Sequence, residues 1–84
     1  MYSTEILLLF FIILNMGIRA IQNKIGKNIR NLRLEQSLSQ EDLAAEVKIS
    51  HDHLSNIENG KYPINIKTLY KLATFFNVDM KYFF

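Results

Sequence analysis

The sequence has no cysteine among its 84 residues, so disulfide bonds and thiolate metal sites are both excluded. Its three glycines do not form the glycine-rich loop that binds nucleotide phosphates. The net charge of +2 is too small to indicate a partner by itself. A chain of this length forms one small domain with a modest core. It contains no separate ligand-sensing domain, so we expect neither a cofactor nor a small-molecule effector.

Groups of residues suited to catalysis are also lacking. His51 and His53 are two positions apart, which places them about 200° apart on a helix, so they cannot share a metal ion. Ser55 lies on the same side as His51, but no third residue orients the imidazole. We therefore expect no enzyme activity, no catalytic residues and no metal site.

Four helix starts share one local pattern, in which an apolar residue precedes a capping residue and a second apolar residue follows the cap by four positions. The caps are Ser39, Ser50, Asn65 and Asp79. Asp42 follows Ser39 by three residues, which approximates a capping box. The pattern predicts helices at about 40–46, 51–58 and 66–76, and a short last turn at 80–84.

A longer helix is predicted before these, from about Ile18 to near Gln36. Its apolar residues recur every three or four positions and form one stripe: Ile18, Ile21, Ile25, Ile29 and Leu32. The same stretch carries basic residues with no acidic residue among them: Arg19, Lys24, Lys27, Arg30 and Arg33. Such a run favours attraction to phosphate, and an ordinary solvated helix face is the alternative.

The two central helices are separated by only three residues, Val47–Ile49. A connection this short forces the helices into contact at a steep angle, as in a helix-turn-helix. On the second helix, four side chains that form hydrogen bonds share the outer side: His51, Asp52, Ser55 and Asn56. Such a side suits the base edges of the DNA major groove, and a merely solvated face is the alternative.

The motifs SQEDLA, IS and LSNIENGK at these spacings resemble the repressor/Cro-like, or XRE-type, helix-turn-helix domains of phage and bacterial regulators. The resemblance extends from Ile25 to Phe83, with IGKNIRNLR at the front and TLYKLATFFNV at the back. It implies an all-α fold of five helices. It also implies a cytoplasmic, sequence-specific regulator of transcription that binds double-stranded DNA, usually as a homodimer on a palindromic operator.

The resemblance assigns the base contacts to the four outer residues of the 51–58 helix. It implies that Gln40 contacts a phosphate or a flanking base, and that the backbone around Asn59–Lys61 contacts a phosphate. Ser39, Lys61 and Tyr62 are further candidates for DNA-backbone contacts, with internal packing as the alternative for Tyr62. Arg33 would form an ion pair with Glu58 beneath the recognition helix. Lys48 and Ser37 stand where the family usually has glycine. If Lys48 has a positive φ, lysine costs about 1 kcal/mol relative to glycine.

Three aromatic residues lie close together near the end of the sequence: Tyr82, Phe83 and Phe84. We expect one to close the core and the others to form an exposed apolar patch for a partner. The last helix of the family often mediates dimerisation, so all three are candidates for a homodimer interface. The alternative is that all three pack internally with the N-terminal run.

Residues 1–18 are predicted to form an apolar segment before a DNA-binding domain of residues 19–84. Its apolar run from Ile6 to Ile18 has thirteen residues, or about 20 Å of helix, against about 30 Å of hydrocarbon in a bilayer. The favoured interpretation is a helix that packs on the domain or across a dimer. A membrane anchor through residues 6–18 is a second, and an upstream extension before a true start at Met16 is a third. In the anchor case, Arg19 and Lys24 would keep the domain cytoplasmic.

A second function class remains open from the sequence, because the same five helices could form a protein-interaction module. An antitoxin-like protein or a membrane-tethered adaptor would be examples. Binding to several phosphates weakens steeply with salt, whereas a protein interface built on aromatic residues does not, so salt dependence distinguishes the two.

Overall fold

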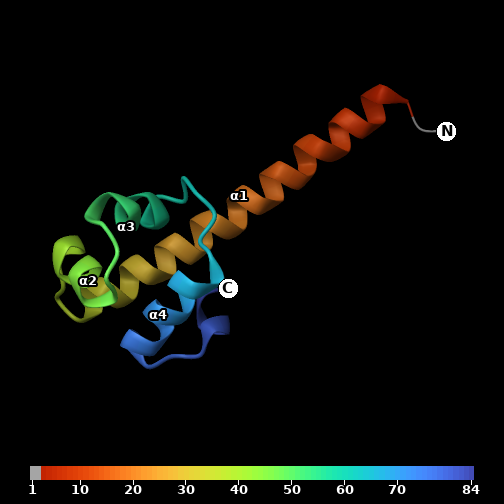
Figure 1. Cartoon of the computed structure of the whole chain (residues 1–84). Helices are drawn as coiled ribbons and strands as arrows, with labels where there is room; N and C mark the ends of the chain where they lie inside the picture. Colours follow the sequence, from red (N-terminus) through yellow and green to blue (C-terminus); the bar gives the residue numbers. More distant parts are fainter. Residues whose placement is uncertain (1–2) are drawn as a thin grey trace.

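The computed structural model describes residues 3–84, which form four α-helices and one short 3₁₀ helix (Figure 1). The elements are α1 (Thr4–Glu35), α2 (Gln40–Val47), α3 (His51–Glu58), α4 (Ile66–Phe76) and η1 (Met80–Phe83). The described residues contain no strand, so the all-α prediction is confirmed. The prediction of five α-helices is wrong, since η1 is a single 3₁₀ turn. Its four residues are enough for the tighter i→i+3 bonds but too few for a regular α-helix.

The predicted capping residues begin α2, α3, α4 and η1. At α2, the Ser39 hydroxyl accepts a hydrogen bond from the Asp42 backbone N–H at 3.0 Å, and the Asp42 carboxylate accepts one from the Ser39 N–H at 3.5 Å. This is the expected capping box. Val47, predicted to begin the turn between the two central helices, is instead the last residue of α2. Lys48 ends α2 in the left-handed conformation, with a φ of 58°.

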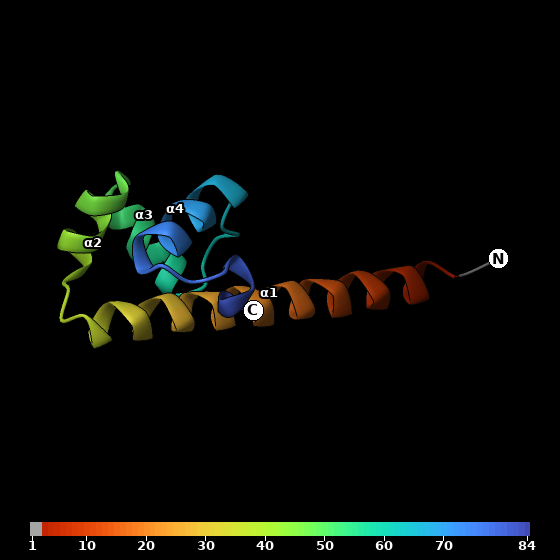
Figure 2. The same cartoon turned by 90° about the horizontal axis from the view of Figure 1, so that it is seen from below.

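The core lies between the C-terminal half of α1 and the other helices (Figure 2). Its buried apolar residues are Ile25, Ile29, Leu32, Leu43, Ala44, Val47, Leu54, Ile57, Leu69, Leu72, Ala73, Phe76 and Phe83. Phe83 is fully buried and closes the core, so it cannot make the dimer contact predicted for it. The Asn28 side chain donates a hydrogen bond to the Phe83 carbonyl at 2.9 Å and holds η1 against α1. Tyr82 and Phe84 stay exposed.

α1 is one continuous helix of 32 residues, and its N-terminal half projects away from the other helices (Figures 1 and 2). The expected boundary between residues 18 and 19 therefore falls inside this helix. The apolar side chains of residues 6–14 are 46% to 66% exposed, so the prediction that they pack on the domain is wrong. No other element reaches this part of α1, which extends the molecule to 52 Å along its longest axis.

The apolar stripe predicted for α1 is buried over a shorter length than expected. Ile18 and Ile21 of α1 are 43% and 51% exposed, and Ile66 at the start of α4 is 72% exposed. These residues line a shallow groove between α1 and the start of α4, together with Pro63 and Phe84. They stay exposed because no further element within residues 3–84 fills that groove.

Candidate nucleic-acid interface

α3 approaches α1 closely at a glycine. A Cβ atom added to Gly26 would lie 2.7 Å from the backbone carbonyl oxygen of Glu58, and nearer still to that of Ile57. Backbone atoms cannot rotate aside as a side chain can, so only glycine fits between the two helices. This contact was not predicted from the sequence. One feature of the sequence could have indicated it: Gly26 lies inside a predicted helix, where glycine costs about 1 kcal/mol of stability relative to alanine.

An ion pair fixes α3 from behind. Arg33 Nε donates to Glu58 Oε2 at 2.7 Å, and Arg33 Nη2 donates to Glu58 Oε1 at 2.9 Å. Both side chains are buried, at 9% and 2% exposure. Arg33 Nη1 also donates to the carbonyl of Leu38 at 2.8 Å, so one guanidinium joins α1, the loop before α2, and α3. Paired and hydrogen-bonded in this way, the two buried charges hold the helix-turn-helix in a fixed orientation.

Gln40 connects this ion pair to the first residue of α3. Its Nε2 donates to Glu58 Oε1 at 3.0 Å, and its Oε1 lies 3.0 Å from His51 Nε2. Because an amide oxygen only accepts, His51 donates from Nε2 in this arrangement. The sequence predicted a DNA-backbone contact for Gln40 and did not reveal its link to Glu58 and His51. The ring of His51 is thereby oriented before any ligand binds.

The four side chains predicted to contact bases lie at the surface of α3. His51 and Asp52 are exposed, and Ser55 and Asn56 are half-buried. The opposite side of the same helix is buried through Leu54 and Ile57. The polar side of α3 is therefore open to a ligand, while its apolar side is held in the core.

Most of the residues predicted to contact the DNA backbone flank this polar side. Ser39 caps α2 and Asn59 ends α3, and both are exposed. Lys61 and Tyr62 are exposed in the loop after α3, which is held by a hydrogen bond from the Lys61 N–H to the Asn56 carbonyl at 3.0 Å.

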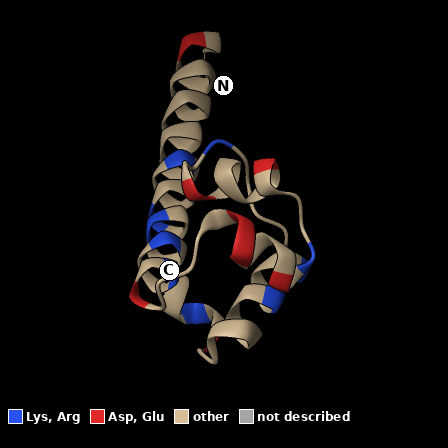
Figure 3. Ribbon diagram, turned by 90° about the vertical axis from the view of Figure 1, so that its left-hand side faces the viewer, with Lys and Arg blue, Asp and Glu red and all other residues tan. Residues whose placement is uncertain are grey.

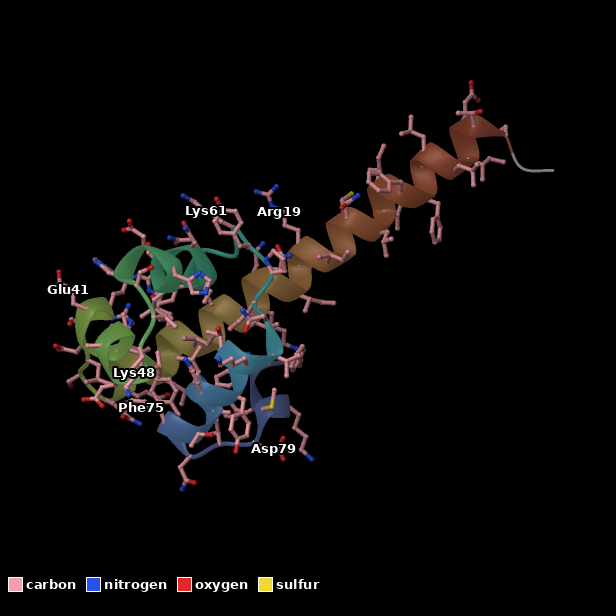
Figure 4. All side chains as sticks on the ribbon, in the orientation of Figure 1. Arg19, Glu41, Lys48, Lys61, Phe75 and Asp79 are labelled. Atoms are coloured by element: carbon pink, nitrogen blue, oxygen red, sulfur yellow. The ribbon has the colours of Figure 1, made fainter. Side chains whose placement is uncertain are left out.

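A further cation joins this loop. Arg19 of α1 and Lys61 line the same small hollow, which Gly60 also lines (Figure 4). The sequence placed Arg19 in the basic run but not beside Lys61. Two cations at one hollow suit an anionic oxygen such as that of a phosphate. Among residues 3–84, no group of three or more His, Asp or Glu side chains is arranged to hold a metal ion.

Two short helices joined by a tight turn, the second with a buried apolar side and an open polar side, define a DNA-binding helix-turn-helix domain. The chain belongs to the helix-turn-helix family, whose sequence profile matches residues 29–83, more than half of the chain. The resemblance inferred from the motifs is thereby confirmed.

Several relatives support this assignment. The ImmF control region 10 kDa protein of Bacillus phage phi105 is 39% identical over 57 residues, which are 68% of this chain and 63% of the phage protein. The control protein C.MunI of Mycoplasma sp is 31% identical over 65 residues, covering 76% of this chain and 88% of that protein. Thus the chain spans less than two thirds of the phage relative but most of C.MunI.

The fold is shared with a solved regulator. The crystal structure of the restriction-modification controller protein C.AhdI from Aeromonas hydrophila matches with a TM-score of 0.73 and 29% identity. The match covers 77% of this chain and 98% of that one. By their names these relatives are control proteins, which points away from enzymatic function.

Proposed function

We propose that this chain is a sequence-specific transcriptional regulator that acts on double-stranded DNA in the cytoplasm. The observation that carries this proposal is the open polar side of α3, fixed from behind by the Arg33–Glu58 ion pair. A helix held in this way enters the major groove with its first residues nearest the base edges. Base contacts then come from His51, Asp52, Ser55 and Asn56.

Each of these side chains offers a different hydrogen-bonding pattern. Asn56 can donate to and accept from adenine at once, and Ser55 can do either with several bases. The carboxylate of Asp52 accepts from the amino group of cytosine and repels bases that offer only acceptors. Sequence specificity follows because the donors and acceptors of the major groove differ for every base pair.

Contacts to the DNA backbone set the position of α3 in the groove. We assign these to Ser39, Gln40, Asn59, Lys61 and Tyr62, which flank the polar side of α3, with Arg19 beside Lys61. Contacts to phosphates fix the register of a protein on the duplex without specifying its sequence. Gln40 has a second role here, since it holds the ring of His51.

A homodimer on a palindromic operator fits the exposed aromatic residues. Tyr82 and Phe84 are 50% and 55% exposed. Phe84 also lines the apolar groove between α1 and α4. Burying these residues against a second copy would remove an exposed apolar patch and place two α3 helices on one side of the duplex.

Selection of binding sites from random duplexes with the purified full-length chain tests the proposal. The expected result is a palindrome whose half-site centres lie about 10–11 base pairs apart, one turn of the double helix. Affinity should also fall steeply with salt, since phosphate contacts release counterions. Selection of no sequence, together with salt-insensitive binding to a protein partner, would instead establish the protein-interaction module.

A further inference from the structure

The N-terminal half of α1 has no role in the fold of the domain. All the apolar core residues lie between Ile25 and Phe83, and no buried residue of α1 precedes Ile25. Yet residues 6–14 are nine consecutive apolar residues, all of them exposed (Figures 1 and 2). An apolar surface of this size needs cover from something outside the domain.

The distribution of apolar residues around the helix favours lipid as that cover. A helix that pairs with a second copy in water has one apolar stripe and polar residues on its remaining faces. Residues 6–14 span two and a half turns with no polar residue on any side. A second copy would cover one side and leave the others in water, whereas a bilayer surrounds the whole helix. We propose that this part of α1 spans a membrane and tethers the DNA-binding domain to it.

The length of α1 permits a crossing. The run of thirteen residues is by itself shorter than the hydrocarbon layer, but α1 continues without a break into the domain, and it is long and apolar enough to cross a bilayer. An 18-residue stretch of α1 that meets this criterion contains no buried residue and measures about 27 Å, close to the hydrocarbon thickness of about 30 Å.

The polar residue inside the run is already satisfied by the helix. Asn15 Nδ2 donates to the backbone carbonyl of Phe11 at 2.9 Å, one turn earlier. A side-chain amide inside a bilayer is costly when it lacks a hydrogen-bond partner. The contact within α1 lowers that cost without a second helix.

The charges at the two ends of the run set its orientation. Glu5 precedes the run, whereas Arg19, Lys24 and Lys27 follow it on the domain side. Figure 3 shows an acidic band near the tip of α1 and basic bands only where the helix reaches the domain. Basic residues stay on the cytoplasmic side of a membrane helix. The domain then faces the cytoplasm, where DNA is present, and the N-terminus faces outward.

Membrane flotation of the full-length chain from bacterial cells tests the tether, because a bound protein rises with lipid and an aggregate sinks. The expected result is flotation that survives a high-salt wash. The double variant Leu9→Lys/Ile13→Lys should lower the floated fraction at least tenfold, since lysine at the centre of a spanning helix is strongly disfavoured. The matched control Leu34→Lys/Tyr70→Lys adds the same charges at exposed apolar positions of the domain and should still float.

The absence of cysteine allows orientation to be measured with single cysteines. With a membrane-impermeant maleimide on intact spheroplasts, Thr4→Cys should react, and Lys67→Cys should react only after lysis. A soluble chain, including a soluble oligomer joined through residues 6–14, would overturn the proposal. So would labelling of both cysteines only after lysis. Neither readout requires DNA binding, so failure here would leave the proposed regulatory function standing.

Discussion

Arg33 in α1 and Glu58 in α3 are 25 positions apart in the sequence, yet their side chains meet in two hydrogen bonds of 2.7 and 2.9 Å. Both are buried, so neither charge is compensated by water. The pair therefore determines where α3 lies relative to the long helix behind it. The recognition surface depends on this contact and on the close approach of the two helices at Gly26.

Removing one member of the ion pair should destabilise the domain strongly. Arg33→Met leaves the Glu58 carboxylate buried and unpaired, and we expect a loss of about 3–5 kcal/mol in the free energy of unfolding. The double variant Arg33→Met/Glu58→Leu should recover part of this loss, because no charge remains buried. Urea denaturation of the three proteins measures both effects. A single-variant loss below about 1 kcal/mol would mean that the pair contributes no more than an exposed one.

Adding one methyl group at Gly26 should displace α3. Gly26→Ala would place a Cβ against the carbonyls of Ile57 and Glu58, so we expect a loss of about 1–3 kcal/mol in stability. Gly17→Ala is the matched control, because a Cβ there meets nothing within 4 Å. It should be neutral or stabilise α1 by about 0.5–1 kcal/mol. Thermal unfolding of the two alanine variants measures the difference in stability between them. Equal effects at Gly26 and Gly17 would contradict the tight packing at Gly26.

Replacing Lys48 with glycine should stabilise the turn between α2 and α3. Lys48 has a φ of 58°, in the left-handed region where a Cβ is unfavourable. Its side chain is exposed, so Lys48→Gly should raise the free energy of unfolding by up to about 1 kcal/mol. Lys48→Ala keeps the Cβ and should give no such gain. The two variants are compared by denaturant midpoint, and a gain from alanine equal to that from glycine would point to the lysine charge instead.

Asn56→Ala should affect specificity. The variant removes an amide from the polar side of α3 but keeps the backbone carbonyl that accepts from Lys61. We expect it to cost about 1–3 kcal/mol on the selected site and to relax the preference at one base pair. Titrations against the selected duplex and a scrambled duplex measure this. An equal loss on both would show that Asn56 contacts only the backbone.

Lys61→Ala should instead weaken binding to every duplex by a similar factor. Lys61 and Arg19 both line the hollow assigned to a phosphate. The slope of log affinity against log salt should fall by about one. Lys81→Ala, in η1, removes the same charge away from α3 and should leave both quantities unchanged. A changed base preference in the Lys61 variant would count against a purely electrostatic role.

The sequence by itself determined the local features of this protein. Ser39, Ser50, Asn65 and Asp79 each cap the helix predicted for them, because a cap bonds to a backbone N–H only two or three residues away. The all-α class, the helix-turn-helix and its polar outer side followed from the same short-range patterns.

Only the tertiary structure decided which surfaces are covered. Periodicity placed Ile18 and Ile21 on the same apolar stripe as the buried Ile25, but the elements that pack there leave a groove open. Periodicity also could not show which of the three adjacent aromatic residues, Tyr82, Phe83 and Phe84, is buried in the core. The link from Glu58 through Gln40 to His51 joins residues up to 18 positions apart, and Gly26 meets a helix that begins 25 residues later. Local hydrogen bonds and propensities act over about one helical turn, whereas burial depends on which distant segment packs against each face.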